Sequence, residues 1–453
     1  MSLARLCLTA LVGGCLLAGS GRAQLAPVTS TRTWARTYGG PVAQQGLYDL
    51  RQLPGGTLAV AGFTGSFGTS SPSGWLMHVE QPTGDVLLER AIGVGASGVT
   101  DGAAVAADGG ALFLGRIIVD LFVKHDGWLV RTDPEGAVVW VRRFTQPGTG
   151  RHFLFDAVEL ADGSWVAAGA TGLLDHPPQA AWVVRLTAAG DLLWQYEYGG
   201  GLSDTARAIT PTSDGGFAVA GWTNSAGAGL DDAWVMKIDA GGGVVWQRTF
   251  GGLDSDQAEH IVELPDGGFA VAGSSNSLTS TGHAPWVLRL DAGGGLLWHR
   301  VVGSDVWGDL GAVELTADGQ LVVVGRVGEP GFPTNDLWCA QLEADTGATR
   351  WQRAYEGDSG DFGSAVLPLS GDSVVLGGTW GWGFEDESVW LLRTGRKGGF
   401  SDCDIVRQTS FELSSPPVTV GHGPLVRSPG TTPLLPFAAT SEPSHATVTP
   451  ICR

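Results

Sequence analysis

The stretch DGGFAVAGWTNSAGAGLDDAWVMKIDAGGGVVWQRTFGG, residues 214–252, decides the fold because its parts recur along the chain. Its second Trp opens an apolar hexamer, and a Trp with such a hexamer returns every 52 to 54 residues, at Trp75, Trp128, Trp182, Trp234, Trp286, Trp338 and Trp390. A fixed period of this length is the signature of repeat architectures, in which each period is one structural unit.

Each unit is predicted to contain four short strands. An apolar segment precedes the DGG turn, FAVAG follows it, the WVMKID hexamer comes third, and WQRTFG ends the unit. Four such strands in about 52 residues are typical of a β-propeller blade. Residues Trp34 to Gly40 repeat the pattern of Trp246 to Gly252, whereas the last unit has no fourth strand after Trp390. We therefore expect an all-β, seven-bladed β-propeller over residues 24–400, with the N-terminal strand closing the last blade.

The composition agrees with a folded chain that has many tight turns. The 453 residues include 71 Gly and 23 Pro, yet 43% are hydrophobic and 18 are Trp, so the glycine content does not indicate disorder. The formal charge is −19, with 27 basic and 46 acidic residues. A surface this acidic repels phosphate backbones, so we expect no nucleic-acid partner.

The N-terminus indicates export. Arg5, an apolar run from Leu6 to Leu17 and the small residues Gly21 and Ala23 are typical of a signal peptide over residues 1–23. No run of about 20 apolar residues follows, so no membrane span is expected. The predicted location is secreted, or periplasmic and cell-surface. The alternative is a lipoprotein anchored at Cys15, because residues 12–15 resemble a lipobox.

Residues 401–453 form a Ser/Thr/Pro-rich C-terminal tail without Trp or Tyr. This composition predicts an extended stalk or a loosely packed appendage. Cys403 and Cys452 bracket the tail, and an exported chain can form disulfides, so we predict a disulfide between them. Cys339 is expected to be a small buried hydrophobic residue.

The DGGFAVAG, WVMKID and WQRTFGG segments resemble the repeats of secreted bacterial β-propellers with a DGG-VAG and W-x-x-TFGG signature, over residues 34–400. The turn at residues 343–347 that leads to Trp351 is similar to the tryptophan-docking repeat of quinoprotein-like propellers. Quinone-dependent members of that superfamily have eight blades and adjacent cysteines, and this sequence has neither feature. The resemblance thus implies a propeller without a quinone cofactor.

The predicted binding face carries the long loops between second and third strands, because long loops commonly hold binding residues. Four Trp residues outside the two repeated Trp positions lie in or near these loops and the blade connections, and they are the candidate ligand-binding residues: Trp222, Trp307, Trp380 and Trp382. Trp380 and Trp382 are suited to stacking on a sugar or a peptide aromatic ring; the alternative is that both rings fold onto the rim.

Catalytic and metal motifs are absent from the sequence. It has no HExxH, CxxC, GxSxG or Walker pattern, so no catalytic residue and no metal ligand is predicted. The acidic pair Asp254 and Asp256 offers oxygen ligands of the kind that Ca²⁺ takes. However, Asp204, Asp256 and Asp361 recur about ten positions before the first turn of their units, which favours hydrogen bonding to backbone amides. No cofactor is expected.

Two functions follow from these observations. The first is a non-catalytic binding or scaffold module of the bacterial envelope or exterior, with a protein, peptide or glycan ligand on the long-loop face. The alternative is an enzyme of quinoprotein-like or glycan-cleaving type with its site at the central channel. A channel lined by converging Asp, Glu and His favours the enzyme, whereas Gly, Ala and Val favour binding.

Overall fold

The computed structural model describes residues 33–452 with gaps. Up to residue 400 the gaps are 41–43, 68–71, 94, 96, 121–123, 146–149, 174–175, 281, 304–305, 329–334, 358–359 and 382–386. In the tail the described segments are 406–408, 413–414, 417–421, 426–429, 434–436, 440–443 and 447–452. The signal peptide, Cys15, Trp382 and Cys403 lie outside the described residues, so what was predicted for them stays a prediction.

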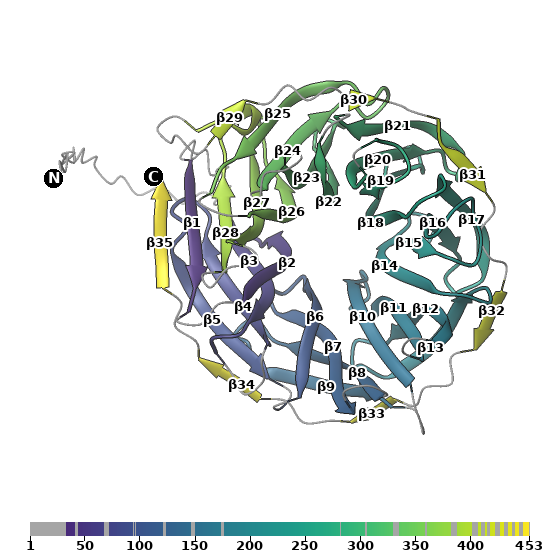
Figure 1. The fold of residues 1–453 in the computed structure, drawn as a ribbon. Helices are drawn as coiled ribbons and strands as arrows, with labels where there is room; N and C mark the ends of the chain where they lie inside the picture. Colours follow the sequence, from purple (N-terminus) through teal and green to yellow (C-terminus); the bar gives the residue numbers. More distant parts are fainter. Residues whose placement is uncertain are drawn as a thin grey trace, which may run out of the picture. The chain divides into compact units, whose positions relative to one another are not determined.

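The described residues form β-strands and one 3-10 turn, η1 (Arg396–Gly398). The first 28 strands pair into four-stranded antiparallel units, which we call blades. Figure 1 shows the blades side by side around a centre, with the first strand of each blade innermost. The predicted all-β, propeller-like class is confirmed.

The strand bounds follow the predicted repeat. Blade 1 contains β2 (Gln45–Gln52), β3 (Thr57–Thr64), β4 (Ser73–Glu80) and β5 (Val86–Gly93). Blade 2 contains β6 (Gly98–Val105), β7 (Ala111–Asp120), β8 (Lys124–Thr132) and β9 (Val138–Phe144). Blade 3 contains β10 (Gly150–Glu159), β11 (Trp165–Leu173), β12 (His176–Leu186) and β13 (Leu192–Gly199). Blade 4 contains β14 (Asp204–Pro211), β15 (Phe217–Thr223), β16 (Asp232–Ile238) and β17 (Val244–Gly251).

The remaining blades have the same order. Blade 5 contains β18 (Asp256–Glu263), β19 (Phe269–Ser275), β20 (Ala284–Leu290) and β21 (Leu296–Val302). Blade 6 contains β22 (Trp307–Leu315), β23 (Leu321–Gly328), β24 (Asp336–Leu342) and β25 (Thr349–Tyr355). Blade 7 contains β26 (Phe362–Pro368), β27 (Val374–Trp380) and β28 (Ser388–Arg393), and β1 (Trp34–Gly39) pairs antiparallel with β28.

The glycine that ends each VAG-like segment creates a β-bulge in the innermost strand. Gly221 of β15 pairs with Ala206 of β14, and the register skips Arg207. A Cβ on Gly221 would overlap the carbonyl oxygen of Thr205, so only glycine lets the bulged strand approach. The corresponding glycines in the other blades face the same kind of carbonyl: Gly62, Gly115, Gly169, Gly273, Gly325 and Gly378.

The repeated Trp residues pack between blades, as predicted. The third-strand Trp residues are all fully buried, and the indole nitrogen of Trp234, for example, donates a hydrogen bond to Gln247 Oε1 at 3.1 Å. The fourth-strand Trp residues reach the next blade instead. Trp246 Nε1 donates to the carbonyl oxygen of Ala292, at 3.0 Å, in the following third-to-fourth-strand turn. The hydrogen bond of Trp234 stays within blade 4, but its ring packs with Val166 and Ala168 of blade 3. Buried apolar surface and the hydrogen bonds of the fourth-strand Trp residues thus join neighbouring sheets.

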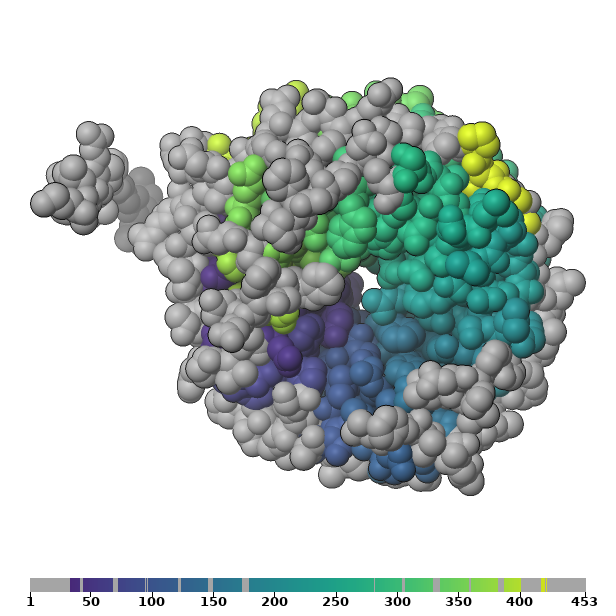
Figure 2. Space-filling view, in the orientation of Figure 1, coloured from purple at the N-terminus to yellow at the C-terminus, as the bar shows by residue number. Residues whose placement is uncertain are grey.

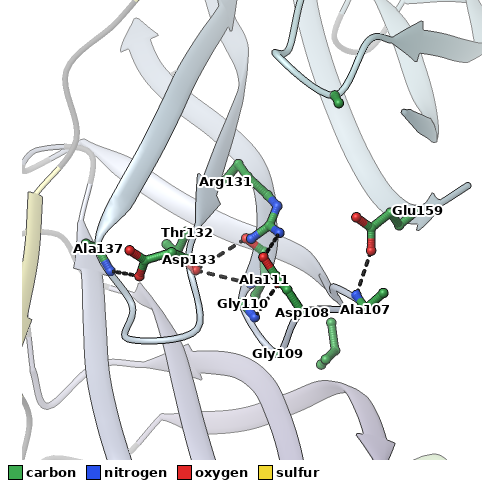
Figure 3. A network of polar contacts seen from close by, with 12 residues as sticks. Ala107, Asp108, Gly109, Gly110, Ala111, Arg131, Thr132, Asp133, Ala137 and Glu159 are labelled. Carbon is green, nitrogen blue, oxygen red and sulfur yellow. Dashed lines mark hydrogen bonds and ion pairs between the residues drawn. The ribbon is translucent and has the colours of Figure 1, made fainter. Parts of the chain in front are cut away.

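Short turns are braced by carboxylates (Figure 3). In blade 2, Asp108 Oδ1 accepts a hydrogen bond from the backbone nitrogen of Gly110 at 2.8 Å, and its other oxygen pairs with Arg131 at 2.7 Å. Glu159 of blade 3 accepts from the backbone nitrogen of Ala107 at 2.6 Å, which ties the two blades together. These acidic residues therefore have structural partners on the face opposite the long loops.

The C-terminal tail pairs with the outermost strand of every blade, and we call its seven short strands the C-terminal belt. They run around the rim in Figure 1 as the yellow segments: β29 (Val406–Gln408), β30 (Leu413–Ser414), β31 (Thr419–Gly421), β32 (Val426–Pro429), β33 (Leu434–Pro436), β34 (Thr440–Pro443) and β35 (Thr447–Cys452). Their partners, in order, are β25, β21, β17, β13, β9, β5 and β1.

The expectation of a stalk or a loosely packed appendage is therefore wrong for the described tail. The unpaired edge of each blade offers backbone donors and acceptors, and the belt uses them. Ser, Thr and Pro suit such an outer strand, because it needs few apolar side chains. No helix in the described part of the chain is long and apolar enough to cross a membrane.

Candidate functional site

The bulges place one residue of each blade at the centre of the molecule, and we call this set the bulge ring. Its members are Tyr48, Asp101, Phe155, Arg207, Glu259, Gly311 and Ser364. All but Asp101 line a central cavity of about 480 Å³. Figure 2 shows a hollow at the centre of the described residues, between the purple, blue and teal segments. Because a bulge inserts an extra residue, it turns that side chain out of the regular sheet register.

The cavity wall is charged and aromatic. Its ionisable residues are Asp156, Arg207, Glu259, His260, His283, Asp309, Arg326 and Glu387, together with the phenol of Tyr48. Three Phe rings complete the wall: Phe63, Phe155 and Phe362. Such a lining combines flat apolar surfaces with groups that orient a polar ligand.

Two members of the bulge ring form an ion pair across neighbouring blades. Arg207 of blade 4 donates its Nε hydrogen to Glu259 Oε2 of blade 5 at 2.7 Å. The guanidinium lies over Phe155 of blade 3, with 5.0 Å between Cζ and the ring centroid. Contacts from both sides thus fix the orientation of Arg207 in the cavity.

A second charged cluster lies on blades 5 and 6. Arg326 donates to Asp309 Oδ2 from Nε at 2.9 Å and from Nη2 at 2.6 Å. The same oxygen lies 3.2 Å from His283 Nε2, while His283 Nδ1 lies 3.0 Å from Asn276 Oδ1. Trp307 covers this cluster, because its ring packs against His283 at 5.4 Å and under Arg326 at 4.8 Å.

Burial changes the titration of the acids near the channel. It raises the pKa of Asp156 to about 7, against the opposing effect of the amide hydrogen bond from Ile209. It also raises the pKa of Asp101 to about 6, although Arg116 acts to lower it. At neutral pH a carboxyl group such as Asp156 is therefore protonated in a substantial fraction of molecules.

The residue after the bulge has a bracing role in alternate blades. Asp49 Oδ2 accepts a hydrogen bond from the backbone nitrogen of Val105 at 2.7 Å, and Asp156 Oδ2 accepts one from Ile209 at 2.8 Å. His260 Nδ1 faces the backbone nitrogen of Val313 at 3.5 Å in the same way. These contacts link blade 1 to blade 2, blade 3 to blade 4, and blade 5 to blade 6.

The four Trp residues predicted to bind a ligand differ in their surroundings. Trp307 reaches the cavity cluster described above. Trp222 is half-buried in β15, and Trp380 is half-buried with its ring edge-on to the buried Trp390 at 4.7 Å. Trp382 lies outside the described residues. Ligand binding by these residues stays a prediction; among the described ones, Trp307 is the residue that contacts ionisable groups of the cavity, His283 and Arg326.

The recurring acidic residues of the long-loop face are hydrogen-bonded to the backbone. Asp256 Oδ2 accepts from the backbone nitrogen of Gly252 at 2.8 Å, and Asp204 Oδ2 accepts from Gly200 at the same distance. Both carboxylates also accept from hydroxyl groups of the second strand. Among the described residues, no three His, Cys, Asp or Glu side chains are grouped as metal ligands. Cys339 is buried and unbridged, as predicted.

The sequence interpretation missed the bulge ring. Each member stands fourteen residues before the glycine of its VAG-like segment, as Arg207 stands before Gly221. That spacing is visible in the sequence. It identifies the bulge residue only if the glycine is recognised as the partner of a bulge, and the sequence interpretation took the glycine as the end of a strand.

Comparisons with known proteins give no family. No protein-family model matches the sequence, and no curated protein matches it, so the resemblance to a propeller repeat family stays an expectation. Among solved structures, Sqt1 of Chaetomium thermophilum is similar with 12% identity and a TM-score of 0.46, over 83% of this chain and 88% of that one. An α-L-arabinanase of Penicillium chrysogenum, complexed with arabinobiose, has 12% identity and a TM-score of 0.46 over 82% and 100%.

A third similar structure, the polysaccharide lyase Uly1, has 9% identity and a TM-score of 0.44, and the match covers 79% of this chain and 90% of that one. At these identities and TM-scores the likeness carries no information on activity.

Proposed function

We propose that this protein is an exported glycan-cleaving enzyme whose site is the central cavity. In this proposal residues 1–23 are the signal peptide, residues 24–400 form a closed ring of seven blades completed by β1, and residues 401–453 are the C-terminal tail. The observation that carries it is the cavity lining, where Asp156, Glu259 and His283 converge with aromatic rings. A non-catalytic channel was expected to show Gly, Ala and Val instead.

The aromatic faces suit a sugar, because the C–H side of a pyranose ring is apolar while its hydroxyl groups need donors and acceptors. Glycoside hydrolysis needs one acid that protonates the leaving oxygen and one carboxylate that assists the attacking water. We assign the first role to Asp156, whose raised pKa retains a proton near pH 7, and the second to Glu259. The oxygen of the attacking water forms a bond to the anomeric carbon while the bond between that carbon and the glycosidic oxygen breaks. The water gives one proton to Glu259, and Asp156 gives its proton to the glycosidic oxygen, which leaves as a hydroxyl group.

The test is cleavage of a panel of oligosaccharides, followed by release of reducing ends, with the purified chain and three variants. Glu259→Gln and Asp156→Asn are expected to reduce kcat at least a hundredfold. Glu343→Gln, on the exposed face of a short turn, is the matched control and should leave kcat unchanged. Thermal unfolding of each variant separates loss of chemistry from loss of fold, which matters for Asp156 because it also braces Ile209.

A second candidate is the non-catalytic binding module. It is favoured by the fact that Asp156, Glu259 and Asp309 all have protein partners, which is typical of a structural network. Saturable binding of an oligosaccharide without release of reducing ends would select this candidate over the enzyme. If the protein neither binds nor cleaves any oligosaccharide of the panel, both candidate functions are refuted.

A further inference from the structure

Three arginines face the channel region from blades 2, 4 and 6, and each pairs with one carboxylate and lies over at least one aromatic ring. Arg116 pairs with Asp101 and lies over Phe153 at 5.3 Å. Arg326 pairs with Asp309 and lies over Trp307. Arg207 has the equivalent pair of contacts from Glu259 and Phe155. The three guanidinium groups are therefore oriented before any ligand arrives.

Arg207 differs from Arg326 in the donors that it leaves unused. Arg326 directs both Nε and Nη2 at one oxygen of Asp309. Arg207 uses only Nε, and neither of its terminal nitrogens has a hydrogen-bond partner among the described residues. Its side chain is 37% exposed and lines the cavity, so these terminal N–H groups are open to a ligand.

We propose that the terminal nitrogens of Arg207 bind a carboxylate of the ligand, so that the glycan is acidic and carries a uronic acid. This inference rests on the proposed function and names its substrate class. Two parallel N–H groups of a guanidinium match the two oxygens of a carboxylate, and Lys cannot reproduce that geometry.

The fixed orientation of Arg207 strengthens such a contact. Glu259 and Phe155 already restrict the side chain, so binding costs little additional rotamer entropy. Glu259 occupies the Nε edge, which leaves the terminal edge for the ligand and places the guanidinium between the two negative charges. A neutral sugar would use these donors only for hydroxyl groups, with weaker hydrogen bonds.

The experiment is calorimetric titration of the purified chain with three matched trisaccharides: oligogalacturonate, its methyl ester and the neutral galactose equivalent. We expect the free acid to bind at least tenfold more tightly than the ester or the neutral sugar. Arg207→Lys keeps the charge and should remove this preference, while Arg142→Lys, on an outer strand, should retain it.

The outcomes separate the two proposals. Equal affinity for all three sugars, or an unchanged preference in Arg207→Lys, would overturn the acidic-ligand inference and leave the proposed function standing. A sulfated galactose trisaccharide that binds more tightly than the uronate would also overturn it, in favour of a tetrahedral anion. If no sugar of the series binds, the acidic-ligand inference fails, and cleavage of the oligosaccharide panel decides on the proposed function separately. A melting temperature of Arg207→Lys close to that of the parent confirms that the variant is folded.

Discussion

The indole nitrogen of Trp34 donates a hydrogen bond to the backbone carbonyl oxygen of Gln81 at 2.7 Å, although Trp34 lies in β1, beside blade 7, and Gln81 follows β4 of blade 1. Tyr38, on the same strand, donates to the carbonyl oxygen of Gly84 at 2.7 Å. Both side chains are buried. The N-terminal strand is therefore fixed to two blades, through its ladder with β28 and through these two side chains.

Replacement of Trp34 tests this role. Trp34→Ala should lower the free energy of unfolding by about 3–5 kcal/mol, because it removes a fully buried indole and leaves the carbonyl of Gln81 without its partner. Trp222→Ala removes a half-buried indole and serves as the control, with a smaller loss expected. Equal losses, measured by urea denaturation, would argue against a special role of β1. Deletion of residues 24–40 should prevent stable folding, and an unchanged melting temperature would contradict ring closure.

Gly221 provides a test of the bulge. Gly221→Ala should cost about 1–3 kcal/mol, because the new Cβ would overlap the carbonyl oxygen of Thr205 and the strands must separate. Gly201→Ala is the matched control, since a Cβ there meets no atom within 4 Å. The melting temperatures of the two variants measure the difference. If Gly221→Ala is as stable as Gly201→Ala, the bulge does not require glycine.

The carboxyl group of Glu314 should make the free energy of unfolding depend on pH. Burial, reinforced by the charge of Asp49, raises its pKa in the folded protein to about 7, above the ordinary value of 4.5. The folded state then holds a proton that the unfolded state has lost, so the stabilisation is complete below pH 4.5 and disappears as the pH rises through 7.

Urea denaturation between pH 4 and 8 measures this effect as a difference between the parent and Glu314→Gln. The parent should lose free energy of unfolding relative to the variant as the pH rises over this range, with a plateau above about pH 7. The exposed control Glu343→Gln should follow the parent at every pH. Parallel curves for the parent and Glu314→Gln would exclude the assigned titration.

The predicted disulfide between Cys403 and Cys452 gains a structural rationale. Phe400 packs against Tyr355 at 6.3 Å and Val406 pairs with the same residue, so the nearest described residues before and after Cys403 both contact blade 6. Cys452 pairs with Ala35 of β1, beside β28 of blade 7. A bond between the two cysteines would join the first and last segments of the tail.

Mass spectrometry of a non-reduced digest should reveal a peptide pair linked through Cys403 and Cys452. The Cys403→Ser variant should be about 2–4 kcal/mol less stable than the parent, and a reducing agent should destabilise the parent but not the variant. Free thiols at both positions in the exported protein would disprove the pairing.

The sequence predicted much of the fold because its signals are local and periodic. Trp234 and Gly242 each recur with the repeat, and their roles, core packing and a tight turn with φ of 79°, depend on neighbouring residues. The belt could not be predicted, since its strands owe their conformation to distant edges and not to their own Ser and Pro residues. The pairing of Thr419 with Gly251 has no counterpart in local sequence.

The candidate site was less predictable. Its residues differ from blade to blade, as in Tyr48, Arg207 and Ser364, because the repeat conserves the backbone of the bulge and leaves the side chain free to vary. Residue types that recur in every blade therefore mark the scaffold. The bulge position holds a different residue in each blade, so a search for repeated residue types does not find it. The ion pair of Arg207 and Glu259 depends on a contact between neighbouring blades.

The belt also sets an order of events during biosynthesis. Its strands pair with blades 6, 5, 4, 3, 2 and 1 in turn and then with β1, so a segment that is synthesised after all the blades pairs with the first strand of the body. Until the belt is synthesised, every blade has a bare outer edge, which is a template for association with other chains. A product truncated before the belt would expose the outer backbone edge of each blade, and synthesis of the belt is the step that covers these edges.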